Sequence, residues 1–82
     1  MRLQYTQHAE EALAERKIRR EWVLRVVVAP VRTESPGDGT KHYLARVREH
    51  GNRVLRVVVN PGTDPPCVVT AFFDRRMKGK LP

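Results

Sequence analysis

The hexapeptide Val-Leu-Arg-Val-Val-Val occurs twice in this chain, at residues 23–28 and 54–59, and each copy has a proline two residues beyond its last valine. The composition of the hexapeptide fits two structures. As a strand, the first copy would alternate its side chains between two faces, and as a helix it would form one apolar stripe of Trp22, Val23, Val26 and Val27. Each β-branched valine costs a helix about 0.5 kcal/mol relative to alanine, although burial often overrides that preference. The surrounding sequence must therefore decide whether each copy forms a helix or a strand.

The two copies lie in different surroundings. The second copy follows the Lys-His-Tyr-Leu-Ala-Arg-Val-Arg segment at residues 41–48 and a Glu-His-Gly-Asn turn signal at residues 49–52, which is the pattern of a β-hairpin. The first copy has no hairpin partner before it, only a segment rich in Glu, Arg and Lys, and Pro30 closes it off. We therefore expect a helix at residues 23–28 and a strand at residues 54–59. Because no similarity extends beyond the hexapeptide and its proline, the chain has no internal repeat.

The other elements follow from caps and turns. Thr6 is a candidate N-cap for a helix over residues 7–16, whose apolar face would hold Tyr5, Ala9, Ala12 and Leu13. Residues 31–35 and 67–74 are further candidate strands, separated by turn-forming residues 36–39 and a proline-rich loop at residues 60–66. Connections of hairpin length cannot join parallel neighbours. The sequence thus predicts one α+β domain over residues 1–82, with two N-terminal helices packed on a four-stranded antiparallel sheet.

The apolar faces also predict a register for the central hairpin. If Tyr43, Ala45 and Val47 face the core, we expect residue 43 opposite 59, 45 opposite 57 and 47 opposite 55, around a loop of residues 50–52. This register places Arg46 directly opposite Arg56 on the other face of the sheet. Like charges in such a position destabilise the strand pair unless an anion or an acidic side chain lies between them. The opposed arginines are therefore a candidate anion site.

The charge of the chain restricts its partners. Sixteen Lys and Arg against nine Asp and Glu give a net charge of +7 over 82 residues, which favours nucleic acid or an acidic protein as partner. The single cysteine, Cys67, cannot form an intramolecular disulfide. No apolar run approaches the roughly 20 residues of a membrane span, and no signal-peptide pattern is present. We expect a cytoplasmic protein without a membrane partner.

Several short motifs resemble a known group of proteins. They are His8-Ala9 opening a helix, Ile18 before the second helix, Lys-His-Tyr at residues 41–43, Leu-Arg-Val-Val at 55–58 and Val-Thr-Ala-Phe at 69–72. Together they resemble small bacterial domains of unknown function that are grouped with BrnT and RelE-type toxins. The resemblance implies a RelE-like fold, cleavage of messenger RNA, often on the ribosome, and silencing by an acidic antitoxin protein. Relatives commonly carry arginine four residues after the helix histidine, where this chain has Ala12.

Cleavage of RNA through its 2′-hydroxyl needs a proton acceptor, cationic groups at the phosphate and a proton donor, but no metal or other cofactor. The candidate acids and bases are His8, His42 and Tyr43, and the candidate phosphate donors are Arg46 and Arg56. Each has a purely structural alternative: His8 as a helix-terminal residue, His42 as a solvated strand residue and Tyr43 as part of the core. Further contacts to RNA are expected from Lys41, Thr70, Arg75, Arg76 and Lys78.

Other classes of site have little support. The sequence contains no metal-ligand cluster, no glycine-rich phosphate loop and no nucleophile elbow. Its five aromatic residues supply few platforms for base stacking, and His50 is expected to belong to a turn without a chemical role. The leading hypothesis is a metal-independent endoribonuclease toxin of a toxin-antitoxin system. The alternative, which Ala12 favours, is a non-catalytic nucleic-acid- or protein-binding domain that retains the toxin fold.

Overall fold

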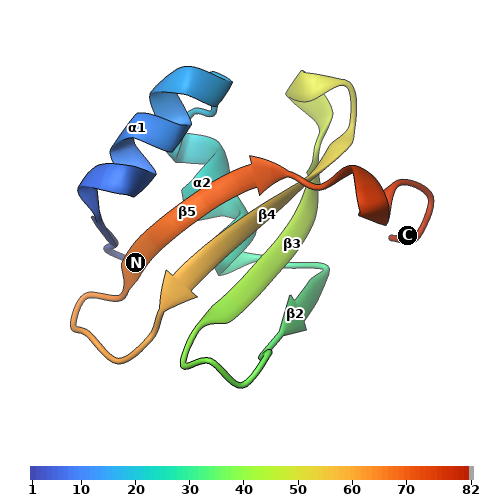
Figure 1. Cartoon of the computed structure of the whole chain (residues 1–82). Coiled ribbons are helices and arrows are strands. Elements are labelled where there is room, and N and C mark those ends of the chain that lie inside the picture. Colours follow the sequence, from blue (N-terminus) through green and yellow to red (C-terminus); the bar gives the residue numbers. More distant parts are fainter. Residues whose placement is uncertain (82) are drawn as a thin grey trace.

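The computed structural model describes residues 1–81 and shows two helices on a five-stranded sheet (Figure 1). The helices and strands are, in order, β1 (Gln4–Tyr5), α1 (Gln7–Arg16), α2 (Arg20–Val28), β2 (Arg32–Glu34), β3 (Lys41–Val47), β4 (Arg53–Asn60) and β5 (Cys67–Phe73). Two short 3-10 turns, η1 (Arg48–His50) and η2 (Arg75–Met77), follow β3 and β5. The predicted α+β class is confirmed. Within the described residues, neither helix is long and apolar enough to cross a membrane.

Helix α1 begins and ends as its sequence indicates. The Thr6 hydroxyl accepts a hydrogen bond from the Ala9 backbone N–H at 3.0 Å, which satisfies one of the free donors of the first turn. The helix ends at Lys17, whose φ of 55° is left-handed and breaks the helical repeat. Its buried face consists of Ala9, Ala12 and Leu13. The predicted helix is therefore confirmed, and so are three of the four residues of its predicted apolar face. The fourth, Tyr5, precedes the helix and lies in β1.

The two copies of the hexapeptide adopt different structures, as predicted. The first copy lies in α2 and buries only one side, so Leu24 remains 37% exposed. The second copy lies in β4, the middle strand of the sheet, and the equivalent Leu55 is completely buried. The arginines differ in the same way, since Arg25 is exposed and Arg56 is only 6% exposed. A central strand is covered on both faces, whereas a surface helix is covered on one.

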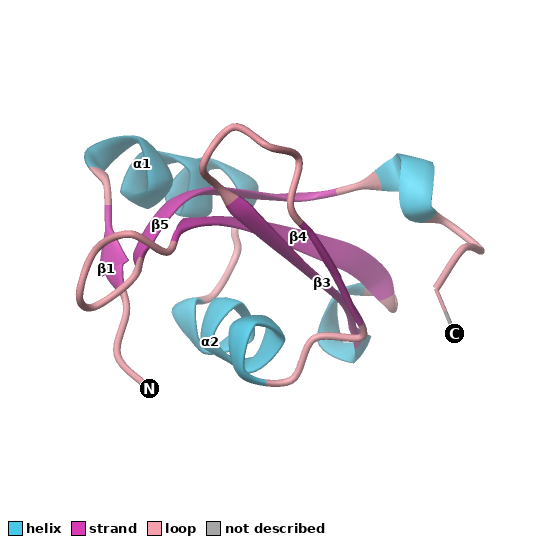
Figure 2. Ribbon diagram, turned by 90° about the horizontal axis from the view of Figure 1, so that it is seen from below, coloured by secondary structure: helices cyan, strands magenta, loops and turns pink. Residues whose placement is uncertain are grey.

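Both helices pack on one face of the sheet. Helix α1 lies along β5, and α2 lies across β3 and β4 (Figure 2). Their apolar side chains form one core with the inward-facing residues of three strands, Ala45, Val47, Leu55, Val57, Val59, Val68 and Ala71. On the opposite face, the segment after β5 folds back and forms a second, smaller apolar cluster of Leu44, Val54, Met77 and Leu81.

The predicted four-stranded antiparallel sheet was incomplete. Strands β2 to β5 are antiparallel neighbours, but β1 adds a fifth strand parallel to β5, so the sheet is mixed, with the order β1-β5-β4-β3-β2. Backbone hydrogen bonds from the Gln4 N–H to the Pro66 carbonyl and from the Thr6 N–H to the Val68 carbonyl hold β1 in the sheet. A strand of two residues is too short to show an alternating pattern in the sequence, so β1 was not predicted. Moreover, the rule about hairpin connections does not restrict strands that are separated by most of the chain.

The predicted register of the central hairpin was wrong by two residues. Residue 43 pairs with 57, 45 with 55 and 47 with 53, around a five-residue connection of residues 48–52. The connection is the η1 turn followed by Gly51 and Asn52, which have positive φ angles of 64° and 58°. Because a shift of two residues leaves every side chain on the same face, the apolar pattern cannot distinguish the two registers. Arg56 therefore lies opposite Leu44 and not opposite Arg46, and the predicted opposed arginine pair was wrong.

The two copies of the hexapeptide allow a matched test of the fold. Replacement of the buried Leu55 by alanine should lower the free energy of unfolding by about 2–5 kcal/mol, because it leaves a cavity in the core. The same replacement at the exposed Leu24 should change it by only about 0.5 kcal/mol. Urea unfolding of Leu55→Ala and Leu24→Ala measures both values. Equal losses would mean that the first copy is buried as a strand would be.

Candidate nucleic-acid interface

Arg56 lies at the centre of a buried ionic network on the face of the sheet opposite the helices. Its Nε donates to Oδ2 of Asp74 at 2.7 Å, and its Nη1 donates to Oε1 of Glu34 at 2.8 Å. Nη1 also lies 2.8 Å from Nδ1 of His42, which accepts in this arrangement because a guanidinium can only donate. Asp74 is 4% exposed. The network therefore joins β4 to β2, to β3 and to the segment after β5.

The acids of this network are strongly stabilised in their ionised forms. The side-chain hydrogen bond from Arg76, together with the one from Arg56, lowers the pKa of Asp74 to about 2, although burial alone would raise it. The hydrogen bond from Arg56 likewise lowers the pKa of Glu34. The Arg56 guanidinium is thus matched by two carboxylates of the chain itself. This arrangement makes Arg56 a structural residue that holds its neighbours in place.

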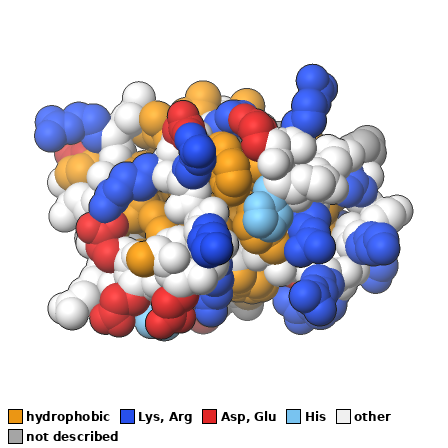
Figure 3. Space-filling model, turned by 90° about the horizontal axis from the view of Figure 1, so that it is seen from above, with side chains coloured by type: hydrophobic (Ala, Val, Ile, Leu, Met, Phe, Trp, Pro, Cys, Tyr) orange, Lys and Arg blue, Asp and Glu red, His pale blue; other side chains and the backbone are white. Residues whose placement is uncertain are grey.

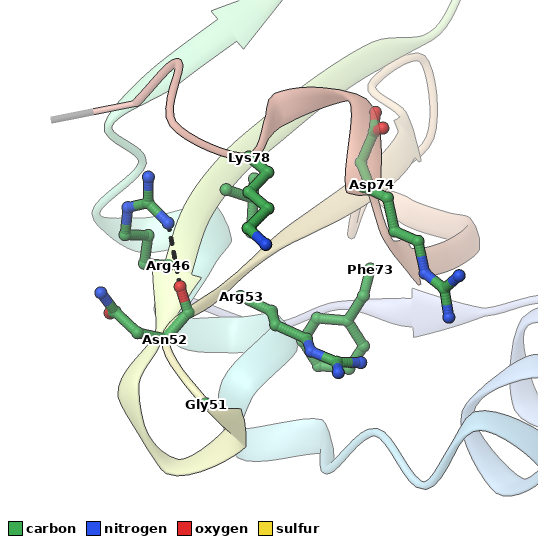
Figure 4. Close-up of a pocket in the computed structure, with 9 residues that line it drawn as sticks. Arg46, Gly51, Asn52, Arg53, Phe73, Asp74 and Lys78 are labelled. Carbon is green, nitrogen blue, oxygen red and sulfur yellow. Dashed lines mark hydrogen bonds between the residues drawn. The ribbon is translucent and has the colours of Figure 1, made fainter.

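A basic pocket lies where the β3–β4 connection meets the end of β5 and the η2 turn (Figure 4). Its volume is about 400 Å³. Four cationic side chains from three segments line it, together with the hairpin turn and one aromatic ring: Arg46, Gly51, Asn52, Arg53, Val54, Phe73, Asp74, Arg75 and Lys78. We call this the basic pocket. Cationic groups that converge from separate segments on one cavity are typical of a site for an anion.

The positive charge of the basic pocket is not neutralised by the chain. Within residues 1–81, none of Arg46, Arg53, Arg75 and Lys78 has a carboxylate within 4.0 Å. Arg46 instead donates to the backbone carbonyls of Asn52 and Leu81, each at 3.0 Å, and these are neutral acceptors. The carboxylate of Asp74 is already engaged by Arg56 and Arg76, and Figure 4 shows it turned away from Arg53.

Phe73, which lines the basic pocket, belongs to a cluster of three aromatic rings. The rings of His50 and Phe73 are stacked, with centroids 4.2 Å apart and planes 8° from parallel. Trp22 meets both edge-on, at 5.9 Å from His50 and 6.4 Å from Phe73. Phe73 also lines the pocket, so the stack and the cations belong to one surface. Seen from above, the surface shows histidine atoms beside hydrophobic side chains, with several Lys and Arg side chains gathered on one side (Figure 3).

The predicted catalytic residues are not brought together in one site. His8 is exposed on the first turn of α1, and Tyr43 is half-buried against the helix-covered core beside Lys41. His42 and Arg56 meet in the ionic network. Only Arg46 reaches the basic pocket, and the register correction explains the separation, because Arg46 pairs with Val54.

The predicted RNA contacts divide in the same way. Arg75 and Lys78 line the basic pocket. Arg76 is exposed but pairs with Asp74, and Thr70 lies on β5, where it accepts a hydrogen bond from Arg16. Sequence reasoning missed His50, Arg53 and Phe73. The only signal for Arg53 was its place directly after the hairpin turn, and no linear pattern connects His50 to Phe73.

The fold and the pocket define a small α+β domain with an unneutralised basic cavity at one end of its sheet. The chain belongs to the family described as Domain of unknown function (DUF4258), whose sequence profile matches residues 5–73. Comparisons with curated proteins and with solved structures give no match. The matched region ends at Phe73, so two cations of the basic pocket, Arg75 and Lys78, lie beyond it.

Arg56 and Arg25 occupy the same position in the two hexapeptides, which gives a second matched pair. Arg56→Ala should lower the free energy of unfolding by about 3 kcal/mol, because the buried Asp74 carboxylate loses its buried partner and keeps only the exposed Arg76. Arg25→Ala breaks only an exposed ion pair with Glu49 and should leave stability nearly unchanged. Denaturant unfolding compares the two variants. A small loss for Arg56→Ala would contradict a structural role for the network.

The lowered pKa of Asp74 predicts the acid limb of the stability curve. Its pKa falls from an ordinary value of 3.8 to about 2 on folding, so its ionised form stabilises the fold above about pH 4. That contribution should be lost as the pH falls toward 2. Thermal unfolding at stepped pH should therefore show a steeper decline for the wild type than for Asp74→Asn in this interval. Parallel curves for the two proteins would contradict the assignment.

Proposed function

We propose that this chain is an RNA-binding domain and that the basic pocket is its phosphate-binding site. The observation that carries the proposal is the convergence of unpaired cations on one cavity. Six of the sixteen Lys and Arg residues pair with carboxylates, namely Arg19, Arg20, Arg25, Arg32, Arg56 and Arg76. Four of the remaining ten line the basic pocket together, and within residues 1–81 none of these four has a carboxylate within 4.0 Å. Bringing four like charges together is unfavourable unless an anion binds among them.

The side chains suit phosphate in particular. The guanidinium groups of Arg53 and Arg75 can each hold two phosphate oxygens with parallel hydrogen bonds. Lys78 and Arg46, whose Nη1 and Nη2 also donate to backbone carbonyls, add positive charge. The net charge of +7 would speed the approach of a polyanion and favours nucleic acid over a small free anion. The resemblance of the sequence to RelE-type domains, whose characterised members act on RNA, supports RNA over DNA as the ligand. The two helices on one face of the sheet are compatible with that resemblance, whereas the parallel strand β1 is not part of the layout that it implies.

A metal-independent endoribonuclease toxin is the second candidate. The observation that favours it is the position of His50, whose ring stacks on Phe73 at the edge of the basic pocket. Histidine side chains exchange protons near neutral pH, and adjacent cations can stabilise the charge that develops on a phosphate during cleavage. In this candidate an acidic antitoxin would inhibit the protein by covering the same pocket. RNA cleavage in the presence of a chelator, lost in His50→Phe without loss of binding, would support it.

RNA binding through the basic pocket should depend strongly on salt. If four cations each contact one phosphate of a single strand, the logarithm of the association constant should fall by about 3 for each tenfold rise in salt. Arg53→Ala should weaken binding at every salt concentration and reduce that slope by about one contact. Fluorescence anisotropy with a labelled oligouridine, titrated between about 50 and 200 mM salt, measures both quantities.

Arg19→Ala is the matched control. It removes the same charge from an exposed residue that lies outside the pocket and pairs with Glu21. It should leave the affinity and the slope close to those of the wild type. Affinity that is independent of salt, or equal losses in Arg19→Ala and Arg53→Ala, would reject the basic pocket as a phosphate site.

A further inference from the structure

The stacked rings of His50 and Phe73 lie where the η1 turn meets the end of β5. The rings come from η1 and β5, and Trp22 of α2 supports both from the side of the core. Trp22 is 7% exposed, whereas His50 and Phe73 are partly exposed. The pair therefore presents aromatic surface to solvent while its inner side is fixed. Rigid, partly exposed aromatic surface is what base stacking on a protein uses.

The stack lies directly beside the proposed phosphate site. Phe73 belongs to both, and Gly51, which lines the basic pocket, follows His50 in the chain. The cavity of about 400 Å³ falls within the range of roughly 300–1,000 Å³ that is usual for small-molecule sites. A nucleotide whose phosphate lies among Arg46, Arg53 and Lys78 would have its base next to the His50 ring.

We propose that the ligand of the basic pocket is single-stranded RNA, and that one unpaired base stacks on the His50–Phe73 pair while the flanking phosphates bind the pocket cations. The inference rests on the proposed RNA-binding function and specifies its substrate class. In a duplex, the faces of the bases are covered by their neighbours, so only an unpaired base can reach the pair. Because every base has an aromatic face, the contact should tolerate many sequences. His50 acquires a role here that its position in a turn did not suggest.

The experiment compares a single-stranded oligouridine with an RNA duplex of the same length. Dissociation constants are measured for the wild type, His50→Ala and His50→Phe, with folding checked by circular dichroism. The wild type should prefer the single strand. His50→Ala should bind the single strand about 10-fold more weakly, with its duplex affinity and its salt slope unchanged, because it loses stacking and no charge contact. His50→Phe keeps an aromatic face and should bind like the wild type.

Trp22, the only tryptophan of the chain, supplies an independent readout. Because its ring contacts both His50 and Phe73, its fluorescence should change when a single strand saturates the protein and should not change with duplex. Because it is measured on the wild type, the Trp22 signal tests base stacking even if His50→Ala fails to fold. Unchanged Trp22 fluorescence at saturation with single strand would overturn the inference.

The outcomes separate this inference from the proposed function. Equal affinity for duplex and single strand, or a His50→Ala variant that is folded and binds as the wild type does, would overturn base stacking and leave RNA binding in place. Absence of binding to either RNA would overturn both. Binding of an acidic polypeptide in place of RNA, again lost in Arg53→Ala, would identify the pocket as a protein interface and would also overturn both.

Discussion

The buried guanidinium of Arg56 determines how the face of this small sheet opposite the helices is completed. It donates to Asp74, to Glu34 and to His42, and so it ties the middle strand to both strands on one side and to the segment that follows β5. Asp74 in turn accepts a hydrogen bond from the Arg76 backbone N–H and caps the η2 turn. The direction in which the chain leaves the sheet is therefore fixed by this one cluster of charges.

The proposed site depends on that direction. Once η2 is anchored, Met77 and Leu81 cover Leu44 and Val54, and the backbone of Leu81 accepts a hydrogen bond from Arg46. The same fold-back brings the cations of the η2 segment next to the hairpin turn, where they line one cavity with Arg53 (Figure 4). A buried charge is tolerated only when it is fully paired, and Arg56 meets that condition with two carboxylates. Acids used there and in the surface pairs are not available to neutralise the basic pocket.

Local sequence context predicted the elements well and their alignment poorly. A hairpin partner before residues 54–59, and its absence before residues 23–28, were enough to distinguish a strand from a helix in identical hexapeptides. The register of β3 against β4 could not be obtained in the same way, because alternation with a period of two is unchanged by a shift of two residues. What fixes the register is the η1 turn with Gly51 and Asn52 in positive φ, a conformation that the letters Glu-His-Gly-Asn do not specify uniquely.

Only the cationic part of the candidate site was predictable from the sequence. An excess of Lys and Arg indicated a polyanionic partner, and three of the predicted residues, Arg46, Arg75 and Lys78, do line the basic pocket. His8 and Tyr43 were predicted as acids or bases because of their side-chain chemistry. In the structure His8 is exposed on α1 and Tyr43 packs against the helix-covered core, so neither lines the basic pocket. His50, Arg53 and Phe73 were missed because their proximity is a product of tertiary structure. His50 and Phe73 are separated in the chain by β4, a loop and nearly all of β5.

The most direct test of this account is a map of amide chemical-shift changes by nuclear magnetic resonance while a short single-stranded RNA is added. The account predicts the largest changes at the two segments that border the basic pocket, residues 50–53 and 73–78, and small changes along α1. A map centred on the exposed apolar side chains of Leu24, Val28 and Val31, or on α1, would contradict it.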